Sequence, residues 1–283
     1  MVLVRRKAPY PHWEFSDPAS GDLLRVVPER GGLISGWRSG ERERLYLDLE
    51  RFADPTLSVR GGIPVLFPIC GGLPGGVLSL PQGRFALPQH GFARDLPWQL
   101  RPLDDGGGIA LELEHCGASL ALYPFRFRLQ LEVRLAPRRL EISAQVHNQG
   151  EQMMPFSFGL HPYFRIDDLT TARFEGLPER CLDQRTGEEC DTAQQVDLLA
   201  EGIDLLSGPA RAVRLLDPTA AAALELETTA PLDLVVIWSD PPRPMVCLEP
   251  WSAPRGALLS GDRRLELAPG DSLRLVCRYR ALA

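Results

Sequence analysis

A strict alternation of apolar with charged or polar side chains runs through residues 125–135, and it constrains the fold more than any other feature. Its apolar members are Phe125, Phe127, Leu129, Leu131, Val133 and Leu135. A period of two places successive side chains on opposite faces of an extended chain, which predicts a long, half-buried strand. The alternation resumes over residues 140–146 after a turn at 136–139, so we expect an antiparallel hairpin that ends at the turn signal of 148–150.

Shorter runs of the same kind are spread along the chain, at 109–113, 212–216, 222–226, 234–238 and 273–279. The 26 glycines and 26 prolines supply turns between them, and long amphipathic helices are missing. Many strands without a strand–helix–strand alternation favour antiparallel sheets packed face to face. We therefore predict an all-β sandwich that forms one domain over residues 1–283.

Composition excludes several classes of protein. No apolar run approaches the ~20 residues that span a bilayer, and the charges at Arg5, Arg6 and Lys7 follow a very short apolar run, the wrong order for a signal peptide. We expect a cytoplasmic protein with no membrane partner. The net charge of −6, with dispersed arginines, makes a nucleic-acid partner unexpected.

The six cysteines show no C-x-x-C spacing, so neither a structural zinc site nor a redox motif is indicated, and most are expected to be reduced core residues. The glycine-rich stretch 71–76 lacks the G-K-[ST] ending of a phosphate-binding loop, and no convincing helix follows it. We interpret this stretch as a flexible loop beside a site.

Two histidines and one glutamate supply the groups needed for proton transfer. His90 lies in the polar segment 87–94, which we interpret as a ligand-facing loop. The alternative, given equal weight, is that His90 is an ordinary loop histidine. His161 lies among aromatic residues, where partial desolvation could hold the imidazole neutral; a hydrogen-bonded core histidine is the alternative. Pro162 favours an extended His161 at a strand end.

Glu249 breaks an apolar strand at 245–248, so its carboxylate should be either paired or functional, because burying it unpaired is costly. Apolar surroundings would raise its pKa toward neutrality, as a general base requires. The structural alternative is a salt bridge to Arg243 or Arg255.

Two further residues are weaker candidates. Arg60 precedes two glycines and a stiff apolar run, so a turn would present it at the end of a strand, where its planar cation suits hydroxyls, carboxylate or phosphate. A surface arginine is the alternative. Asp204 fits a surface turn equally well.

Four segments, in this order, resemble the aldose 1-epimerase (mutarotase) superfamily, most closely its hexose-6-phosphate mutarotase branch. They are R-G-G-I-P-V-L-F-P, L-P-Q-H-G-F-A-R-D-L-P-W, L-H-P-Y-F-R-I-D-D-L and V-C-L-E-P, and smaller echoes extend the similarity over nearly the whole chain. The resemblance implies a galactose-mutarotase-like supersandwich of antiparallel strands, with a sugar cleft and catalysis without metal or organic cofactor.

The resemblance also implies roles for individual residues. His161 matches the general acid and Glu249 the general base of ring opening, while His90 matches a substrate-positioning histidine. The remaining substrate-binding matches are Arg60, Arg94 and Asp204. Pro162 stands where Thr or Ser is usual, and the 71–76 insertion replaces a shorter loop, so we expect the family's chemistry but not necessarily its choice of substrate.

The expected function is therefore an aldose 1-epimerase acting on a hexose or hexose 6-phosphate, by a monomer or weak homodimer with only small-molecule partners. A non-catalytic carbohydrate-binding protein on the same fold is the main alternative, and retention of both His161 and Glu249 argues against it. A polysaccharide lyase or glycosidase-associated domain is a third, although such proteins are usually longer and secreted.

Overall fold

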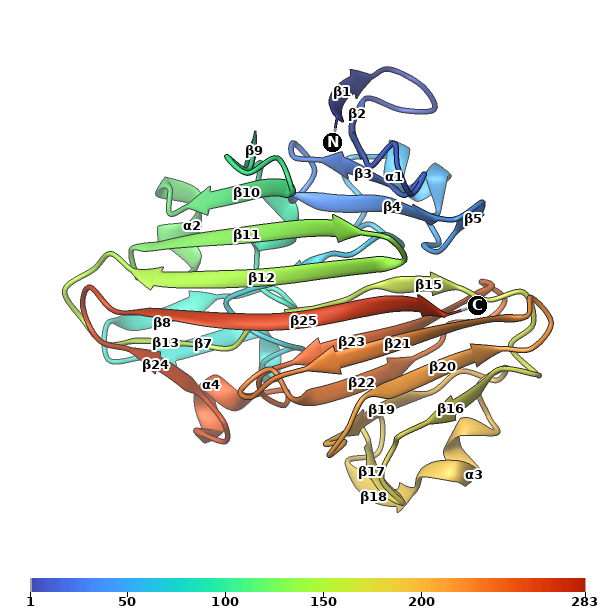
Figure 1. The fold of residues 1–283 in the computed structure, drawn as a ribbon. Helices are drawn as coiled ribbons and strands as arrows, with labels where there is room; N and C mark the ends of the chain where they lie inside the picture. Colours follow the sequence, from blue (N-terminus) through green and yellow to red (C-terminus); the bar gives the residue numbers. More distant parts are fainter. Residues whose placement is uncertain (1, 283) are drawn as a thin grey trace.

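The structure, a computed structural model that describes residues 2–282, is built from antiparallel strands joined by turns and a few short helices (Figure 1). Every pairing between its named strands is antiparallel. The predicted all-β class is therefore confirmed.

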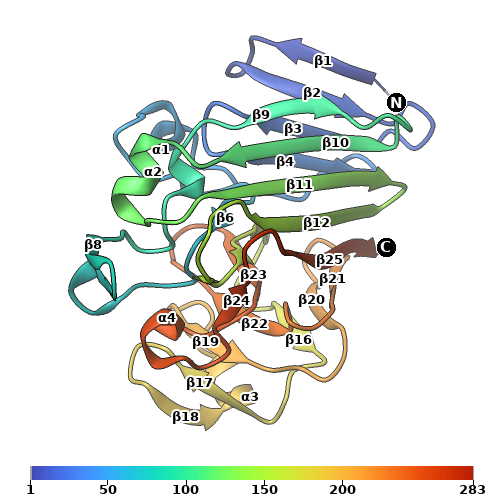
Figure 2. The ribbon, with the colours of Figure 1, turned by 90° about the vertical axis from the view of Figure 1, so that its left-hand side faces the viewer.

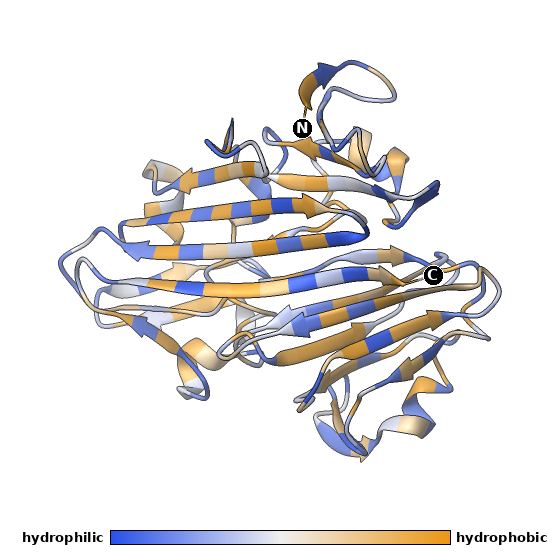
Figure 3. Cartoon of the chain, in the orientation of Figure 1, coloured by the Kyte–Doolittle hydropathy of each residue, from blue (hydrophilic) through white to orange (hydrophobic). Residues whose placement is uncertain are grey.

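The first large sheet contains the predicted hairpin. Its strands, in spatial order, are β16 (Arg173–Glu175), β20 (Val213–Asp217), β21 (Ala222–Thr228), β25 (Ser272–Leu282), β12 (Arg139–Asn148), β11 (Phe127–Ala136), β10 (Gly108–Glu114) and β9 (Gln99–Pro102). Buried residues alternate with more exposed ones along β11, and Figure 3 shows the same alternation of hydropathy in β11 and β12. The alternation thus sets the register, which runs from Phe127 opposite Asn148 to Ala136 opposite Arg139.

The second large sheet lies behind the first and carries Asp204 and Glu249 (Figures 1 and 2). Its order is β18 (Glu188–Asp191), β17 (Arg180–Asp183), β19 (Asp204–Ser207), β22 (Leu234–Trp238), β23 (Met245–Trp251), β14 (Gly159–Leu160) and β6 (Val65–Leu66), and β15 (Tyr163–Arg165) also pairs with β23. The hydroxyl of Tyr279 in β25 donates a hydrogen bond to the Leu248 carbonyl in β23 at 3.1 Å, so the two sheets are joined directly.

The expectation that Glu249 breaks its strand is wrong. β23 continues through Glu249 and Pro250 to Trp251. Since neighbours in a strand point to opposite faces, Val246 and Leu248 enter the main core, whereas Cys247, Glu249 and Trp251 face away from it. This second face carries the site described below.

The N-terminal part forms a five-stranded sheet of β1 (Val2–Arg6), β2 (His12–Ser16), β3 (Leu23–Val27), β4 (Leu33–Ser39) and β5 (Arg42–Glu43). Two smaller sheets have two strands each: β7 (Val77–Leu80) and β8 (Gly83–Ala86) form a hairpin, and β13 (Met154–Phe156) pairs with the distant β24 (Leu265–Leu267). The α-helices are α1 (Leu49–Ala53), α2 (Gly117–Leu122), α3 (Thr192–Val196) and α4 (Ala257–Ser260). Over residues 2–282, no helix has the length and apolar character needed to cross a membrane.

Candidate active site

Glu249 is a buried carboxylic acid on the pocket face of β23, with 1% of its surface exposed. Trp251, on the same face, donates a hydrogen bond from Nε1 to its Oε2 at 3.0 Å. Burial raises the pKa of Glu249 well above its usual range, and this bond opposes the shift. The predicted alternative of a salt bridge is wrong, because Arg243 pairs with Asp240 and Arg255 pairs with Asp204.

His161 follows the end of β14 directly, as its position before a proline predicts. Its backbone N–H donates to the Pro64 carbonyl at 3.0 Å, and its ring stacks on Tyr163 with centroids 4.7 Å apart. Its Nδ1 atom lies 3.4 Å from Oε1 of Glu249, close enough for an ion pair when the imidazole is protonated. The same Nδ1 atom makes no hydrogen bond. The base and acid candidates therefore meet although 87 residues lie between them in the chain.

The electrostatic setting disfavours charge on either member of this pair. Burial, reinforced by the positive charges of Arg94 and Arg60, lowers the pKa of His161 to about 3. The favoured uncharged forms are a neutral imidazole and a protonated carboxyl, and moving the carboxyl proton to the imidazole gives the imidazolium and carboxylate forms. Transfer of this proton needs little movement across the 3.4 Å separation.

His90 adopts a left-handed backbone conformation with φ of 66°, and Gly91 follows with φ of 70°. A Cβ atom on Gly91 would lie 2.1 Å from the Phe67 carbonyl oxygen, so only glycine fits there. The residue pair thus turns the loop so that the His90 ring stands edge-on to His161, with centroids 5.5 Å apart.

The tautomer of His90 is fixed by a backbone contact. The Gly71 N–H can only donate, and it lies 3.0 Å from Nδ1 of His90, which must therefore be the acceptor. Burial lowers the pKa of this histidine well below its usual range, so the ring is neutral. Its proton is then on Nε2, which can donate to a bound hydroxyl; the Gln89 side-chain nitrogen 3.3 Å away is also a donor, so it does not compete as an acceptor.

Arg60 and Arg94 bring positive charge to the same pocket. Arg60 lies in the loop before the isolated bridge residue Gly61, so the predicted strand end is only a single bridge, and its guanidinium lies 5.8 Å from the Trp238 ring centre. Arg94 donates a hydrogen bond to the Gln89 carbonyl at 2.8 Å.

Asp204 opens β19 and is held from two sides. Arg255 donates to its Oδ2 at 2.6 Å, and the Gln184 side chain donates to its Oδ1 at 2.8 Å. Its carboxylate is half-buried and the residue lies in a strand, so the alternative of a surface turn is wrong. A fixed carboxylate of this kind can accept hydrogen bonds from hydroxyl groups.

One cavity of about 140 Å³ is lined by all six predicted site residues: Arg60, His90, Arg94, His161, Asp204 and Glu249. It is also lined by six residues not selected from the sequence: Ser58, Gln89, Val236, Trp238, Trp251 and Arg255. Arg255 was considered only as a salt-bridge partner. Trp251 could have been found from its place two residues after Glu249, which puts both side chains on one face of a strand.

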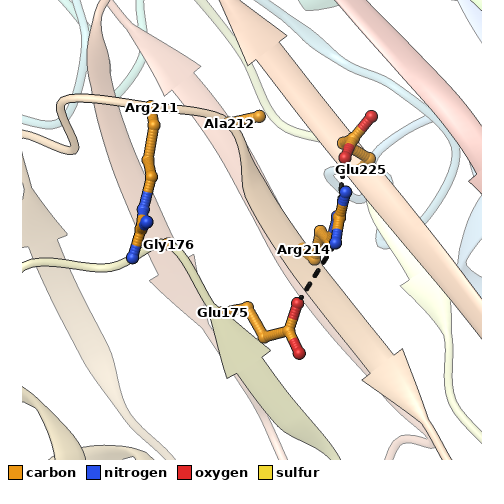
Figure 4. A pocket seen from close by; sticks show the side chains of 6 residues that line it. All are labelled: Glu175, Gly176, Arg211, Ala212, Arg214 and Glu225. Atoms are coloured by element: carbon orange, nitrogen blue, oxygen red, sulfur yellow. Dashed lines mark hydrogen bonds and ion pairs between the residues drawn. The ribbon is translucent and has the colours of Figure 1, made fainter.

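A larger hollow of about 490 Å³ lies elsewhere, beside β16, β20 and β21 (Figure 4). Its Arg214 pairs with Glu225 at 2.6 Å and with Glu175 at 3.4 Å, so the charges there are matched within the hollow. Figure 4 shows these side chains directed at one another across neighbouring strands. It offers no buried acid and base pair of the kind found in the smaller cavity.

Ligand atoms of His161, Cys247 and Glu249 lie within 4.8 Å of one another, which is the donor set a metal ion would need. The same pocket contains Arg60 and Arg94, whose charges oppose a bound cation. The donor set is therefore better suited to carrying protons than to carrying a divalent metal.

A family model described as aldose 1-epimerase matches residues 21–280. The chain is 31% identical over 159 residues to an Escherichia coli (strain K12) protein named "Putative glucose-6-phosphate 1-epimerase", and the match covers 55% of this chain and 49% of that relative. A Cenchrus ciliaris protein of the same name is 31% identical over 159 residues, covering 52% and 45%. The chain thus spans about half the length of the curated relatives it matches.

Solved structures resemble it over almost the whole chain. A Synechocystis sp. PCC 6803 protein is 34% identical with a TM-score of 0.91, covering 99% of this chain and 98% of that one. A structure from Escherichia coli K12 named "Putative aldose 1-epimerase" has a TM-score of 0.78 at 22% identity, covering 96% and 98%. The second likeness shows the fold alone.

Proposed function

The chain belongs to the aldose 1-epimerase family, and from this premise we propose that it interconverts the α and β anomers of a hexose, with hexose 6-phosphate as the preferred sugar. The observation that carries the proposal is the buried contact of 3.4 Å between His161 and Glu249 at a polar cavity. A protein that only bound sugar would have no use for two ionisable groups buried against each other, because their desolvation costs free energy.

The chemistry needs one proton removed and one delivered. Glu249, as the carboxylate, takes the proton of the C1 hydroxyl, and His161, as the imidazolium, protonates the ring oxygen as the bond from that oxygen to C1 breaks. The two reacting oxygens are bonded to the same carbon, so their acid and base must also be close together. The open-chain aldehyde then rotates about C1–C2, and closure with the roles reversed gives the other anomer.

Two further groups position the sugar. His90, neutral and with its proton on Nε2, donates to a sugar oxygen, while Asp204 accepts hydrogen bonds from hydroxyls. The ring of Trp238, which is only partly buried, lines the same cavity and offers an apolar face to the C–H side of a pyranose. General acid and base groups typically contribute ~10²–10⁴ each, and orientation of both against one sugar adds to this factor.

A phosphate group on the substrate would do more than bind. The charges of Arg94 and Arg60 lower the pKa of His161 and so oppose its protonation, which the acid role requires. A phosphate dianion paired with these arginines would neutralise that field, and the pKa of His161 would rise. This supports hexose 6-phosphate over free hexose, since only the phosphorylated sugar brings the counter-charge.

The test is anomer-exchange NMR on the wild-type protein with glucose, galactose and their 6-phosphates side by side. We expect accelerated α/β exchange, with the largest kcat/KM for a 6-phosphate. Exchange of free hexoses alone would refute the phosphate preference. Binding without exchange of any of the four sugars would refute the enzymatic function and favour a carbohydrate-binding protein.

A further inference from the structure

Cys181 and Cys190 face each other across the hairpin at the edge of the second large sheet. Cys181 lies in β17 and Cys190 in β18, and the strand register makes them direct partners. Their sulfur atoms are 3.5 Å apart, and both are free thiols. No spacing in the sequence marks this pair, since eight residues separate the two cysteines.

We propose that Cys181 and Cys190 are a redox modification site that closes to a disulfide and reopens. Direct partners in an antiparallel pair have Cα atoms ~4.5–5.5 Å apart, inside the ~4.4–6.8 Å range that disulfides occupy. The backbone is thus already placed for the bond, and side-chain rotation supplies the remaining approach of the sulfur atoms.

The exposure of the two cysteines indicates which thiol is oxidised first. Cys190 is half-buried and can be reached from solvent, whereas Cys181 is buried, and burial raises its pKa to about 11. A hydroperoxide is the oxidant class that fits: the Cys190 thiolate attacks the O–O bond and becomes a sulfenic acid, with release of an alcohol or water. The Cys181 thiol then attacks the sulfenic sulfur, the S–O bond breaks, and the hydroxyl leaves as water with the Cys181 proton, so that two electrons in all have passed to the peroxide.

The same hairpin leads into Gln184, which contacts Asp204 of the cavity. Gln184 follows β17 directly and binds Asp204 twice, by its side chain to Oδ1 and by its backbone N–H to the carbonyl, both at 2.8 Å. A cross-link three residues away fixes the strand that presents Gln184, so oxidation is coupled to the position of Asp204. This consequence rests on the proposed function, whereas the disulfide itself does not.

The experiment treats the reduced 283-residue chain with equimolar hydrogen peroxide, blocks the remaining thiols with N-ethylmaleimide, and maps the peptides by mass spectrometry. We expect a loss of two hydrogens, a linked peptide pair containing Cys181 and Cys190, and its reversal by dithiothreitol. Cys190→Ser must abolish the link. Cys116→Ser, which removes the exposed cysteine, is the matched control and must leave the link intact.

Two results would overturn the proposal. In the first, peroxide oxidises Cys116 while N-ethylmaleimide still alkylates both Cys181 and Cys190. In the second, the disulfide-linked peptide pair still forms in Cys190→Ser. The coupling is measured separately, as KM and kcat for exchange in the reduced and oxidised forms. We expect KM to rise on the order of fivefold, the low end of measured coupling between sites, with kcat within a factor of about two. An unchanged KM in fully oxidised protein would refute the coupling and leave the disulfide standing.

Discussion

Replacing Trp251 by Phe tests how the proposed base is held in its reactive form. Trp251 is fully buried, and its indole N–H is the donor to Oε2 of Glu249 at 3.0 Å. Phenylalanine keeps an aromatic ring in the same place and removes only this donor and part of the volume. We therefore expect the effect to fall on the ionisation of Glu249.

The magnitude follows from the strength of the lost bond. A hydrogen bond to a charged group contributes ~1.5–3 kcal/mol, and one pKa unit corresponds to ~1.4 kcal/mol. Burial already raises the pKa of Glu249, and the Trp251 donor lowers it. Losing the donor removes stabilisation from the carboxylate, so the pKa rises further, by roughly one to two units.

The assay is the pH dependence of kcat/KM from anomer-exchange NMR. Since the base must be ionised, the acid limb of the profile should move upward by roughly one to two pH units. Trp37→Phe is the matched control. Trp37 lies in β4 of the N-terminal sheet and is also fully buried, but its Nε1 atom has no hydrogen-bond partner. An unmoved limb in Trp251→Phe, or an equal shift in both variants, would refute the reasoning.

Three further outcomes are expected. Because the pKa of Glu249 is raised by folding, wild-type stability falls as pH rises above about 4.5; Glu249→Gln removes this loss and should unfold at higher urea concentration at pH 8, with little difference at pH 4. Arg60→Gln should raise KM for glucose 6-phosphate by about 10–100-fold and for glucose much less, as side-by-side exchange kinetics would show. His161→Ala should lower kcat by about 10²–10⁴ with sugar binding retained in calorimetry. Equal urea midpoints at pH 8, equal KM changes for both sugars, or an unchanged kcat would contradict the respective expectation.

Local periodicity predicted the strands, because apolar and polar side chains alternate along consecutive residues of a strand that buries one face. The hairpin of β11 and β12 was expected at 125–135 and 140–146 and forms at 127–136 and 139–148. The same logic missed the continuation of β23, because a carboxylate and a proline look like a strand end. In the structure, Glu249 and Pro250 pair with Val236 and Val235 of β22, so the partner strand holds them in the sheet.

The grouping of the site was predicted only through resemblance, since no local pattern brings residues 60, 90, 161, 204 and 249 to one cavity. Contacts that depend on how distant segments pair could not be predicted from the sequence. Arg255 meets Asp204 across 51 residues, and Gly71 sets the His90 tautomer across 19. Each depends on which strands become neighbours, and this is decided by packing of the whole chain rather than by any one segment.

The central claim is that Glu249 removes the C1 hydroxyl proton. It is tested most directly by two-dimensional exchange NMR of glucose 6-phosphate with wild-type protein and Glu249→Gln, a change that preserves the size of the side chain. The account predicts that the enzyme-dependent α/β exchange rate falls by at least about 10² while the variant stays folded and still binds the sugar. Exchange at the wild-type rate in Glu249→Gln would contradict it.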